Sequence, residues 1–497
     1  MHNLYYYTSL VLILGAFNIK RMKRTILILL AFFLNLNLYS HPWKPSHYVI
    51  IDTDGGIDDM RAICMMLSSP DIRVLAITTS SGVLSAENAY IKVKSLLNSF
   101  YHEGLPVGIN RKTGYPSQNF ATALQTNWGD EGGIDPAQAN DFMRLISKTI
   151  SAERTKISFI CLGGMTTVNM AFKELPDFKL QVKEIIWSAD GVKDTKGFNY
   201  SIDRKAASDI LMEDIPVRIV KGFGEEIFFD KGLLKSISEI NTIYAQKISG
   251  FFRSGTAAEH SYSFSGHDEM VALYIHYPQL FKADSVDNKS ENTPFEKSDI
   301  REFTVKILKG ETVAKNQVIK VFPVDPSFYF ADVEPGVTEI ISKYGLDEWT
   351  SGVLANELHR HLGVFAIVGV KMGIRAREYF CTGVDEFRVT TFAGATPPLS
   401  CMNDGLQVST GATPGHGLLT VSSDTITRPV AEFTYLDHKI RLTLKPDIAE
   451  KISSELKEIN FVYGLDSNIY WELVRKNSIK YWRDLDRNNI FLIEEIY

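Results

Sequence analysis

The densest group of residues that could carry chemistry lies near the start of the chain, where four aspartates fall within eight positions. They are Asp52, Asp54, Asp58 and Asp59, with a glycine pair at positions 55 and 56 between them. Carboxylates so close together repel one another strongly in a partly dry cleft unless a positive charge lies between them. Their oxygens suit Ca²⁺ or Mg²⁺ rather than zinc, and the glycines let the backbone turn so that both aspartate pairs can reach one ion.

One of these aspartates could instead cap the helix that follows, because aspartate is a favoured N-cap residue. That role does not account for the other three. The pattern as a whole therefore predicts a divalent cation site.

Three later segments place polar groups beside predicted helices. The run from Leu162 to Ala171 follows a strand-like segment and opens a helix, and Asn199 comes shortly before a helix predicted at 204–211. His267 and Asp268 stand together directly before a further helix. A lone histidine at such a position is usually a surface or capping residue, but its neighbour Asp268 favours a functional role.

The elements that must position these residues alternate between short apolar runs and amphipathic stretches. Strand-like runs occur at 48–51, 74–77, 157–162, 184–187 and 217–220, with helix-like stretches at 58–67 and 86–100. This rhythm predicts an α/β fold with a mostly parallel sheet flanked by helices, whose functional residues gather at the carboxyl ends of the strands. A polar stretch at 284–299 predicts an exposed loop, and strand-like alternation resumes at 303–307.

Taken in order, the aspartate-rich loop, the Leu162–Ala171 segment and the His267-Asp268 pair resemble the inosine-uridine nucleoside hydrolase family over roughly residues 47–344. The resemblance implies a Ca²⁺ ion bound by Asp54, Asp59, Asp268 and the backbone carbonyl of Leu162. It also implies calcium-dependent hydrolysis of the N-glycosidic bond of a nucleoside or related glycoside, through an oxocarbenium-like state.

The same resemblance implies a role for each remaining residue. Asp54 would take the proton from a water molecule whose pKa the ion lowers, and His267 would donate a proton to the departing base. Asp58 and Asn199 would bind the sugar, and Asp52 would support the loop from behind the ligands.

Two other functions stay open. A strand followed by Asp-x-Asp-Gly also resembles the haloacid dehalogenase-type phosphatases, where Asp52 would be the nucleophile, but that chemistry does not need the pair Asp58-Asp59. The other is a catalytically silent, metal-dependent glycoside-binding protein.

The silent binding protein stays open because several positions depart from the nucleoside hydrolase pattern. Val83 follows Gly82 where the family has asparagine, Gly197 stands where it has glutamate, and the stretch 189–196 is short. Residues 127–129, Asn-Trp-Gly, replace the His-Gly that the family carries. Lost sugar contacts of this kind could each cost a few kcal/mol, so a modified or 5′-substituted glycoside is a candidate substrate.

A second group with metal-binding residue types lies in the last third of the chain. His359 and His361 precede an apolar helix, and Cys401 and Asp404 begin a later Gly-rich segment. Together these segments resemble the family of E-type subunits of formylmethanofuran dehydrogenase over roughly residues 347–445. Histidine nitrogen and cysteine sulfur suit a transition metal, although residues two apart share no helix face, so both histidines could bind one only outside a helix. An ordinary α+β domain with no metal is the alternative.

The first forty residues predict a signal peptide. Basic residues at 20–24 precede an apolar run from Thr25 to Leu38, and the small Ser40 closes the run. We expect cleavage after Ser40, Met22 as the true start, and a periplasmic or extracellular location. The upstream apolar patch at 4–17 is either an over-extended gene start or one arm of a membrane anchor, and neither run reaches the roughly 20 residues of a spanning helix.

Length and composition predict a globular chain of several parts. We expect a nucleoside hydrolase-like domain at 41–346, a smaller α+β domain at 347–450 and a helical extension at 451–497. The net charge of -6 gives no reason to expect nucleic acid or, once the signal is removed, a membrane as a partner, and a homo-oligomer stays open. Four cysteines form no disulfide scaffold, although Cys381 and Cys401 could pair in an exported protein.

Overall fold

The computed structural model describes residues 44–496 apart from 113–119, 191–196, 225, 255–260 and 314–317. The predicted signal peptide at 1–40 lies outside the described residues. Two lobes, each with its own sheet, are distinguished below: a first lobe up to residue 313 and a second lobe from residue 326. No helix within the described ranges is both long and apolar enough to cross a membrane.

The first lobe is built on a nine-stranded sheet with strand order β4-β3-β2-β1-β5-β6-β7-β9-β8. Every neighbouring pair is parallel except β8 and β9, which are antiparallel. The strands are β1 (His47–Thr53), β2 (Ile72–Thr79), β3 (Val107–Ile109), β4 (Asn140–Asp141), β5 (Ile157–Cys161), β6 (Val182–Ser188), β7 (Val217–Val220), β8 (Phe281–Val286) and β9 (Lys289–Pro294). The predicted, mostly parallel sheet is confirmed.

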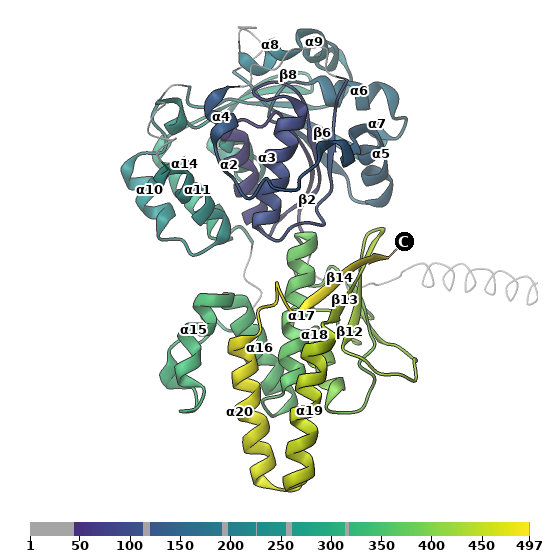
Figure 1. The fold of residues 1–497 in the computed structure, drawn as a ribbon. Helices are drawn as coiled ribbons and strands as arrows, with labels where there is room; N and C mark the ends of the chain where they lie inside the picture. The colour runs from purple at the N-terminus through teal and green to yellow at the C-terminus, as the bar shows by residue number, and fades with distance from the viewer. Residues whose placement is uncertain are drawn as a thin grey trace, which may run out of the picture. The chain divides into compact units, whose positions relative to one another are not determined.

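Helices cover both faces of this sheet, as Figure 1 shows. Alternate side chains of β1 explain why, since Val49 and Ile51 belong to one apolar core, and Tyr48 and Ile50 to the other. The first core takes side chains from α2, α3, α10, α11, α13 and α14, and the second from α5, α6, α7 and α9. The helices are α2 (Ile57–Ser68), α3 (Ala86–Ser99), α4 (Ala121–Gln125), α5 (Phe142–Ala152), α6 (Thr166–Glu174), α7 (Phe178–Gln181), α8 (Phe198–Ile202), α9 (Arg204–Met212), α10 (Lys231–Ser238), α11 (Ile243–Arg253), α13 (Glu269–His276) and α14 (Lys297–Leu308).

The second lobe combines helices with a five-stranded sheet of order β11-β10-β12-β13-β14. Its strands are β10 (Arg388–Thr391), β11 (Leu419–Val421), β12 (Val430–Tyr435), β13 (His438–Leu444) and β14 (Phe491–Ile496). Its helices are α15 (Glu334–Tyr344), α16 (Leu346–His359), α17 (Val364–Phe380), α18 (Met402–Thr410), α19 (Pro446–Tyr463) and α20 (Asn468–Asp484). This is the smaller α+β unit that the sequence predicts.

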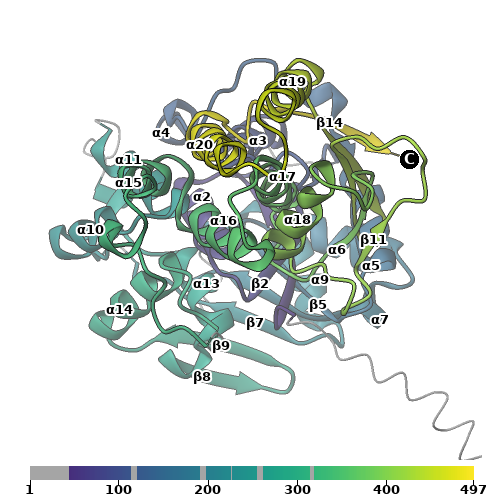
Figure 2. The same ribbon diagram turned by 90° about the horizontal axis from the view of Figure 1, so that it is seen from below.

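The central helix of the second lobe is α17, which lies among α16, α18 and α20 (Figure 2). Glycines permit its close approach to α18. A Cβ at Gly369 would lie 2.1 Å from the carbonyl oxygen of Met402, and one at Gly405 would lie 2.1 Å from that of Ala366.

The predicted domain limits need correction at both ends of the second lobe. The sequence prediction placed helix α15 before the boundary at 346. Its residues Val337 and Ile340 instead lie in one apolar cluster with Trp349 and Trp482 of the second lobe. The expected helical extension at 451–497 is also part of this lobe, because its last residues form β14 and pair with β13.

Two local predictions in the first lobe were wrong. The stretch 284–299, expected to be a loop, holds most of the β8–β9 hairpin, and β9 is hydrogen-bonded to β7. The segment 303–307, expected to be strand-like, is part of helix α14, where Thr304 and Ile307 are buried. In the second lobe, the expected long helix at 353–379 is broken between α16 and α17.

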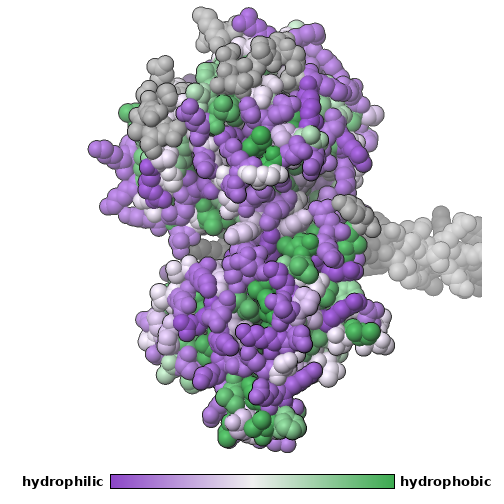
Figure 3. Space-filling view, viewed as in Figure 1, coloured by the Kyte–Doolittle hydropathy of each residue, from purple (hydrophilic) through white to green (hydrophobic). Residues whose placement is uncertain are grey.

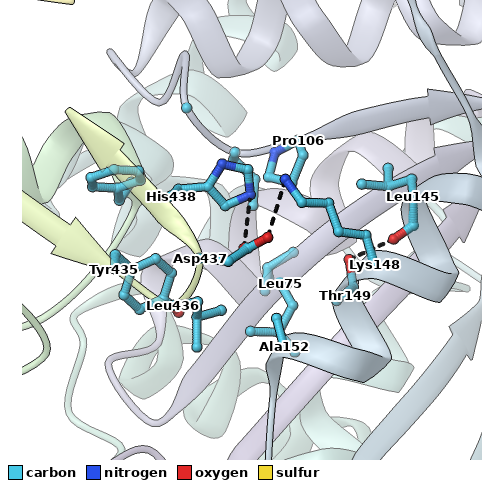
Figure 4. Close-up of a pocket in the computed structure, with 14 residues that line it drawn as sticks. Leu75, Pro106, Leu145, Lys148, Thr149, Ala152, Tyr435, Leu436, Asp437 and His438 are labelled. Carbon is cyan, nitrogen blue, oxygen red and sulfur yellow. Dashed lines mark hydrogen bonds and ion pairs between the residues drawn. The ribbon is translucent and has the colours of Figure 1, made fainter. Parts of the chain in front are cut away.

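Contacts between the lobes include charged pairs and a small apolar cavity. Arg73 Nε donates to Glu386 Oε2 at 2.9 Å, and Arg375 Nη2 donates to Glu103 Oε1 at 2.8 Å. A cavity of about 30 Å³ lies between β2, α5 and the β12–β13 turn, with Asp437 placed between Lys148 and His438 (Figure 4). That volume holds little more than one water molecule, so it is a packing gap rather than a ligand site.

The face shown in Figure 3 is mostly polar, with apolar residues gathered at the turn between α19 and α20. Phe461 is 91% exposed there, beside the exposed Val462 and Leu465. All four cysteines are free, so the pairing of Cys381 with Cys401 that the sequence allowed does not occur.

Candidate active site

Four separate segments, residues 54–59, Leu162, Asn199 and residues 267–268, bring the predicted site residues to the carboxyl edge of the first-lobe sheet. Asp54 follows β1, and Asp58 and Asp59 lie in the first turn of α2. Asp268 directly precedes α13. The turn between β1 and α2 depends on Gly55, whose φ of 82° lies in the left-handed region that glycine adopts without strain.

These residues line one cavity of about 610 Å³, a size suited to a small-molecule ligand. Its lining includes all the residues of this lobe that the sequence assigned to metal, substrate or catalysis: Asp54, Asp58, Asp59, Leu162, Asn199, His267 and Asp268. No lysine or arginine occurs among the described residues that line it.

Three carboxylates form the tightest part of this site. One oxygen from each of Asp58, Asp59 and Asp268 can be chosen so that all lie within 4.8 Å of one another, and the three residues are buried. Asp59 is held in place, because its Oδ1 accepts hydrogen bonds from Thr53 Oγ1 at 2.5 Å and from the Asp54 amide at 3.2 Å. Three carboxylate oxygens this close can act as ligands of a single cation.

Asp54 lies beside this group. Both of its carboxylate oxygens are buried, and neither has a hydrogen-bond partner among the described residues. Its side chain is confined by two glycines, since a Cβ at Gly82 would lie 2.1 Å from Asp54 Oδ2 and one at Gly163 would lie 2.9 Å from it. A buried, unpaired carboxylate is costly, so its orientation indicates a ligand or a proton as partner.

The pKa values of Asp54, Asp59 and Asp268 are raised by burial and by the repulsion between neighbouring carboxylates. Burial, together with neighbouring Asp59, raises the pKa of Asp54 well above its usual range. Burial and the charge of Asp58 raise the pKa of Asp59 to about 6, and the pKa of Asp268 rises for the same two reasons. A divalent cation would offset this repulsion, and the all-oxygen donor set fits a hard ion such as Ca²⁺ or Mg²⁺.

Asp52 lies behind the cavity rather than in its lining. Its Oδ1 accepts a hydrogen bond from Thr78 Oγ1 at 2.6 Å and its Oδ2 accepts one from Ser80 Oγ at 2.9 Å. Its backbone carbonyl accepts from the Leu162 amide at 2.9 Å, which ties the loop after β5 to β1. Burial raises the pKa of Asp52 to about 7. A carboxylate held in this way is poorly placed to attack a phosphoryl group, which disfavours the phosphatase alternative.

Asn199 is placed differently from the expectation that it simply grips the sugar. Its side-chain amide donates to the Leu162 carbonyl at 2.5 Å and to the Ser188 carbonyl at 3.0 Å. Asn199 therefore orients the carbonyl that was predicted to bind the metal. A carbonyl oxygen has two lone pairs, so Leu162 retains the capacity to bind a cation as well.

A buried ion pair that sequence reasoning missed joins the two segments that carry the clustered aspartates. Arg61 of α2 donates through Nε to Glu269 Oε1 of α13 at 2.5 Å, and both side chains are almost completely buried. Glu269 Oε2 accepts the His267 amide at 3.0 Å. Arg61 also lies 4.6 Å from the ring centroid of Phe229. The pair thus fixes the His267-Asp268 turn relative to Asp58 and Asp59.

Aromatic residues at the cavity also escaped the sequence analysis. Phe120 and Phe198 both line it, with ring centroids 5.8 Å apart, and both are partly exposed to solvent. Their positions suit stacking against a flat ring of a ligand. Nothing in the local sequence distinguished them from core phenylalanines.

The departures from the family pattern have local structural causes. A Cβ at Gly197 would lie 2.7 Å from Asp190 Oδ2, so a glutamate there would displace Asp190, which itself lines the cavity. Val83 is in the lining as well. Trp128 is 1% exposed and stacks on Phe251, so this position serves the core instead of the ligand.

The residues of the predicted second metal site also come together, in the second lobe. His359, His361 and Cys401 offer ligand atoms within 4.8 Å of one another. Burial raises the pKa of Asp404, and the charges of both histidines act in the opposite direction.

The fold and the site define an α/β protein with a cavity for a small ligand and a group of buried carboxylates at its sheet edge. The family model of the inosine-uridine preferring nucleoside hydrolases matches residues 49–331, more than half of the 497 residues, and the chain belongs to that family. The first lobe is accordingly an enzyme domain of the N-glycosyl hydrolase class. A second model, described as FmdE, molybdenum formylmethanofuran dehydrogenase operon, matches residues 358–461.

Individual relatives align with the first lobe at low identity. A pyrimidine-specific ribonucleoside hydrolase of Salmonella paratyphi B is 24% identical over 260 residues, which cover 47% of this chain and 80% of that protein. The inosine-uridine preferring nucleoside hydrolase of Leishmania major is 24% identical over 263 residues, 48% of this chain and 81% of that protein. The solved structure of a plant nucleoside hydrolase covers 53% of this chain and 99% of its own, at 18% identity and a TM-score of 0.45.

Proposed function

We propose that the first lobe hydrolyses the N-glycosidic bond of a nucleoside or related glycoside and that it depends on Ca²⁺. The observation that carries the proposal is the unpartnered Asp54 carboxylate beside the buried group Asp58, Asp59 and Asp268. Side chains and the Leu162 carbonyl supply only oxygen donors, which favours calcium over a transition metal.

The family resemblance suggests a role for each residue, and the surroundings of Asp54 support the role given to it. Asp54 makes no side-chain hydrogen bond within the described residues, and burial raises its pKa, so it can accept a proton from water attacking the anomeric carbon. Asp58 accepts hydrogen bonds from sugar hydroxyls, and His267 donates a proton to the departing base. A bound cation would supply Lewis-acid activation of water and offset the carboxylate charge.

The lining of the cavity supports a sugar-binding end that differs from the family pattern. Asp190 occupies the space beside Gly197 and offers a carboxylate near the position where the family pattern has glutamate. We propose that Asp190 replaces that glutamate as an acceptor for a sugar hydroxyl, while Phe120 and Phe198 stack on the leaving group. The substrate class is then a glycoside with a flat aromatic base and a sugar whose 5′ side differs from that of an ordinary ribonucleoside.

The test is a screen of nucleosides and 5′-substituted nucleosides for release of reducing sugar. Asp54→Asn keeps the size of the side chain but removes the base, and it should lower the rate by at least about 100-fold. The control is Asp177→Asn, an exposed aspartate at the start of α7, which should leave the rate unchanged.

A chelator should abolish the activity of the wild-type chain, and Ca²⁺ should restore it better than Mg²⁺. If Ca²⁺ binds but no glycoside in the screen is cleaved, the lobe is a silent binding protein. If Mg²⁺ alone restores activity, the assignment of calcium is wrong.

We also propose that the chain is exported, on the basis of the basic and apolar segments before Ser40. N-terminal sequencing of the protein from its native cell should begin at His41. A mature protein that still carries residues 25–38 would contradict this.

A further inference from the structure

We infer that the second lobe holds a transition-metal site of the zinc class, formed by His359 Nε2, His361 Nε2 and Cys401 Sγ. This inference does not depend on the function proposed for the first lobe, because it concerns different residues and a different kind of ion. Each of these three residues offers one possible ligand atom, and the atoms so chosen all lie within 4.8 Å of one another.

The break between helices α16 and α17 makes this arrangement possible. Helix α16 ends at His359, and Arg360 takes a left-handed conformation with φ of 70°. A non-glycine residue rarely adopts that conformation, and such strain is concentrated at functional sites. Its effect is to turn the chain so that His361 faces the same side as His359, which a continuous helix would not allow.

Both imidazole rings are oriented for binding through the same nitrogen. His359 Nδ1 lies 3.0 Å from the Ala355 carbonyl oxygen, and His361 Nδ1 lies 3.2 Å from the His359 carbonyl oxygen. A backbone carbonyl beside Nδ1 keeps the proton on that nitrogen and leaves the lone pair on Nε2, which is the usual arrangement around a metal-bound histidine.

The two Nε2 atoms converge on one point. A Cβ built on Gly363 would lie 2.8 Å from His359 Nε2 and 3.5 Å from His361 Nε2. His359 Nε2 is buried and has no hydrogen-bond partner among the described residues. A buried, unsatisfied lone pair beside a second imidazole nitrogen and a thiol is the environment that a metal ion would satisfy.

The chemistry of the donors selects the ion. Two imidazole nitrogens and one thiolate suit Zn²⁺ and disfavour Ca²⁺ or Mg²⁺. Asp404, three residues after Cys401, lies near both histidines. The thiolate and this carboxylate together balance the two positive charges of the ion. Three protein ligands leave a fourth position for Asp404 or for a molecule from solution.

Cobalt titration of the full chain, after removal of metal with a chelator, tests the inference. A Co²⁺ ion bound to Cys401 gives a sulfur-to-cobalt charge-transfer band in the near ultraviolet, whereas Co²⁺ in the carboxylate site of the first lobe gives none. We expect one equivalent of Co²⁺ to produce the band and Zn²⁺ to abolish it by displacement. No such band in the wild-type chain would overturn the inference.

Variants separate the site from other thiols. Cys401→Ser should remove the band, while Cys381→Ser, a matched change at another partly exposed cysteine, should leave it intact. Gly363→Ala places a methyl group against His359 Nε2 and should weaken Zn²⁺ binding by at least about tenfold without removing a ligand. Zn²⁺ should raise the thermal unfolding midpoint of the wild-type chain but not that of Cys401→Ser. A band that persists in Cys401→Ser or disappears in Cys381→Ser would refute the assignment.

Discussion

The buried pair of Arg61 and Glu269 offers the sharpest test of how the active-site loops are held. The substitution Glu269→Gln keeps the size of the side chain and removes its charge, which leaves the Arg61 guanidinium buried at 0% exposure without a counter-charge. Breaking a buried ion pair by removing one partner costs about 3–5 kcal/mol. Glutamine can still accept a hydrogen bond from Arg61, so we expect a loss near the lower limit, about 3 kcal/mol.

The loss should appear both in stability and in the site. Hydrogen exchange of peptides from α2 and α13, followed by mass spectrometry as urea is added, reports the opening of these helices separately from the second lobe. Because Glu269 also accepts the His267 amide, the turn that carries His267 and Asp268 should shift. A displacement of about 1 Å at a catalytic site can cost about 100-fold in rate, so glycoside hydrolysis should fall by that order.

A double-mutant cycle isolates the pair from other effects of the substitutions. Arg61→Met and Glu269→Gln should each be destabilising, and the double variant should lose less than the sum of the two by at least about 2 kcal/mol. The matched control is the exposed pair of Arg475 and Asp332, where Asp332→Asn should cost less than about 1 kcal/mol. Additive effects within about 0.5 kcal/mol would show that Arg61 and Glu269 do not stabilise each other, and the reasoning would fail.

Three further predictions concern other parts of the chain. Gly82→Ala puts a Cβ 2.1 Å from Asp54 Oδ2 and should lower hydrolysis by about 100-fold with little change in unfolding, whereas Gly250→Ala, which meets no atom within 4 Å, should leave the rate unchanged. Burial and a neighbouring histidine lower the pKa of His276 to about 4 in the folded chain. In the unfolded chain His276 has its ordinary pKa of about 6.5, so between these two pH values only the unfolded chain binds a proton there. First-lobe stability in urea should therefore be full above about pH 6.5 and drop by about 3 kcal/mol as the pH approaches 4, and His276→Gln should flatten this dependence; an unchanged slope would contradict it. Gly405→Ala places a methyl group 2.1 Å from a backbone oxygen of α17 and should cost about 1–3 kcal/mol in urea unfolding of the second lobe, and a neutral result would mean that the two helices can separate freely.

The sequence predicted those parts of the first lobe that local patterns determine. The apolar runs of β1, β2 and β5 are buried on both faces, so hydrophobicity alone reveals them. The strand β9, Lys289–Pro294, is polar and was missed, because its place in the sheet comes from hydrogen bonds to β7 and β8 and not from burial of apolar side chains. Helix α14 was mistaken for a strand because a five-residue window at 303–307 shows too little of the helical period.

Site residues could likewise be predicted where a local sequence pattern marks them, but not where their role depends on contacts between distant segments. The aspartates of the β1–α2 turn could be identified from their spacing. Arg61 and Glu269 could not, because 208 residues separate them and each looks like an ordinary surface charge on an amphipathic helix. Asn199 was found, but its contact with the Leu162 carbonyl depends on the packing of α8 against the end of β5. The limit at residue 346 failed because α15 has the composition of either lobe, and only its packing on Trp349 assigns it.

Two kinds of buried charge occur in the first lobe: an ion pair whose charges neutralise each other, and carboxylates that lie beside like charges. Arg61 and Glu269 are compensated by each other, so their burial stabilises one arrangement of two helices without needing a ligand. Asp54, Asp59 and Asp268 are buried with like charges beside them, and for each the pKa is raised by burial and repulsion. The fold tolerates this repulsion because the compensated pair and the hydrogen bonds to Asp59 hold the carboxylates in position. If the proposed Ca²⁺ binds here, little of its binding free energy is needed to reorganise the loops. A chain with a weakened Arg61–Glu269 pair should then bind Ca²⁺ less tightly, although every proposed ligand remains.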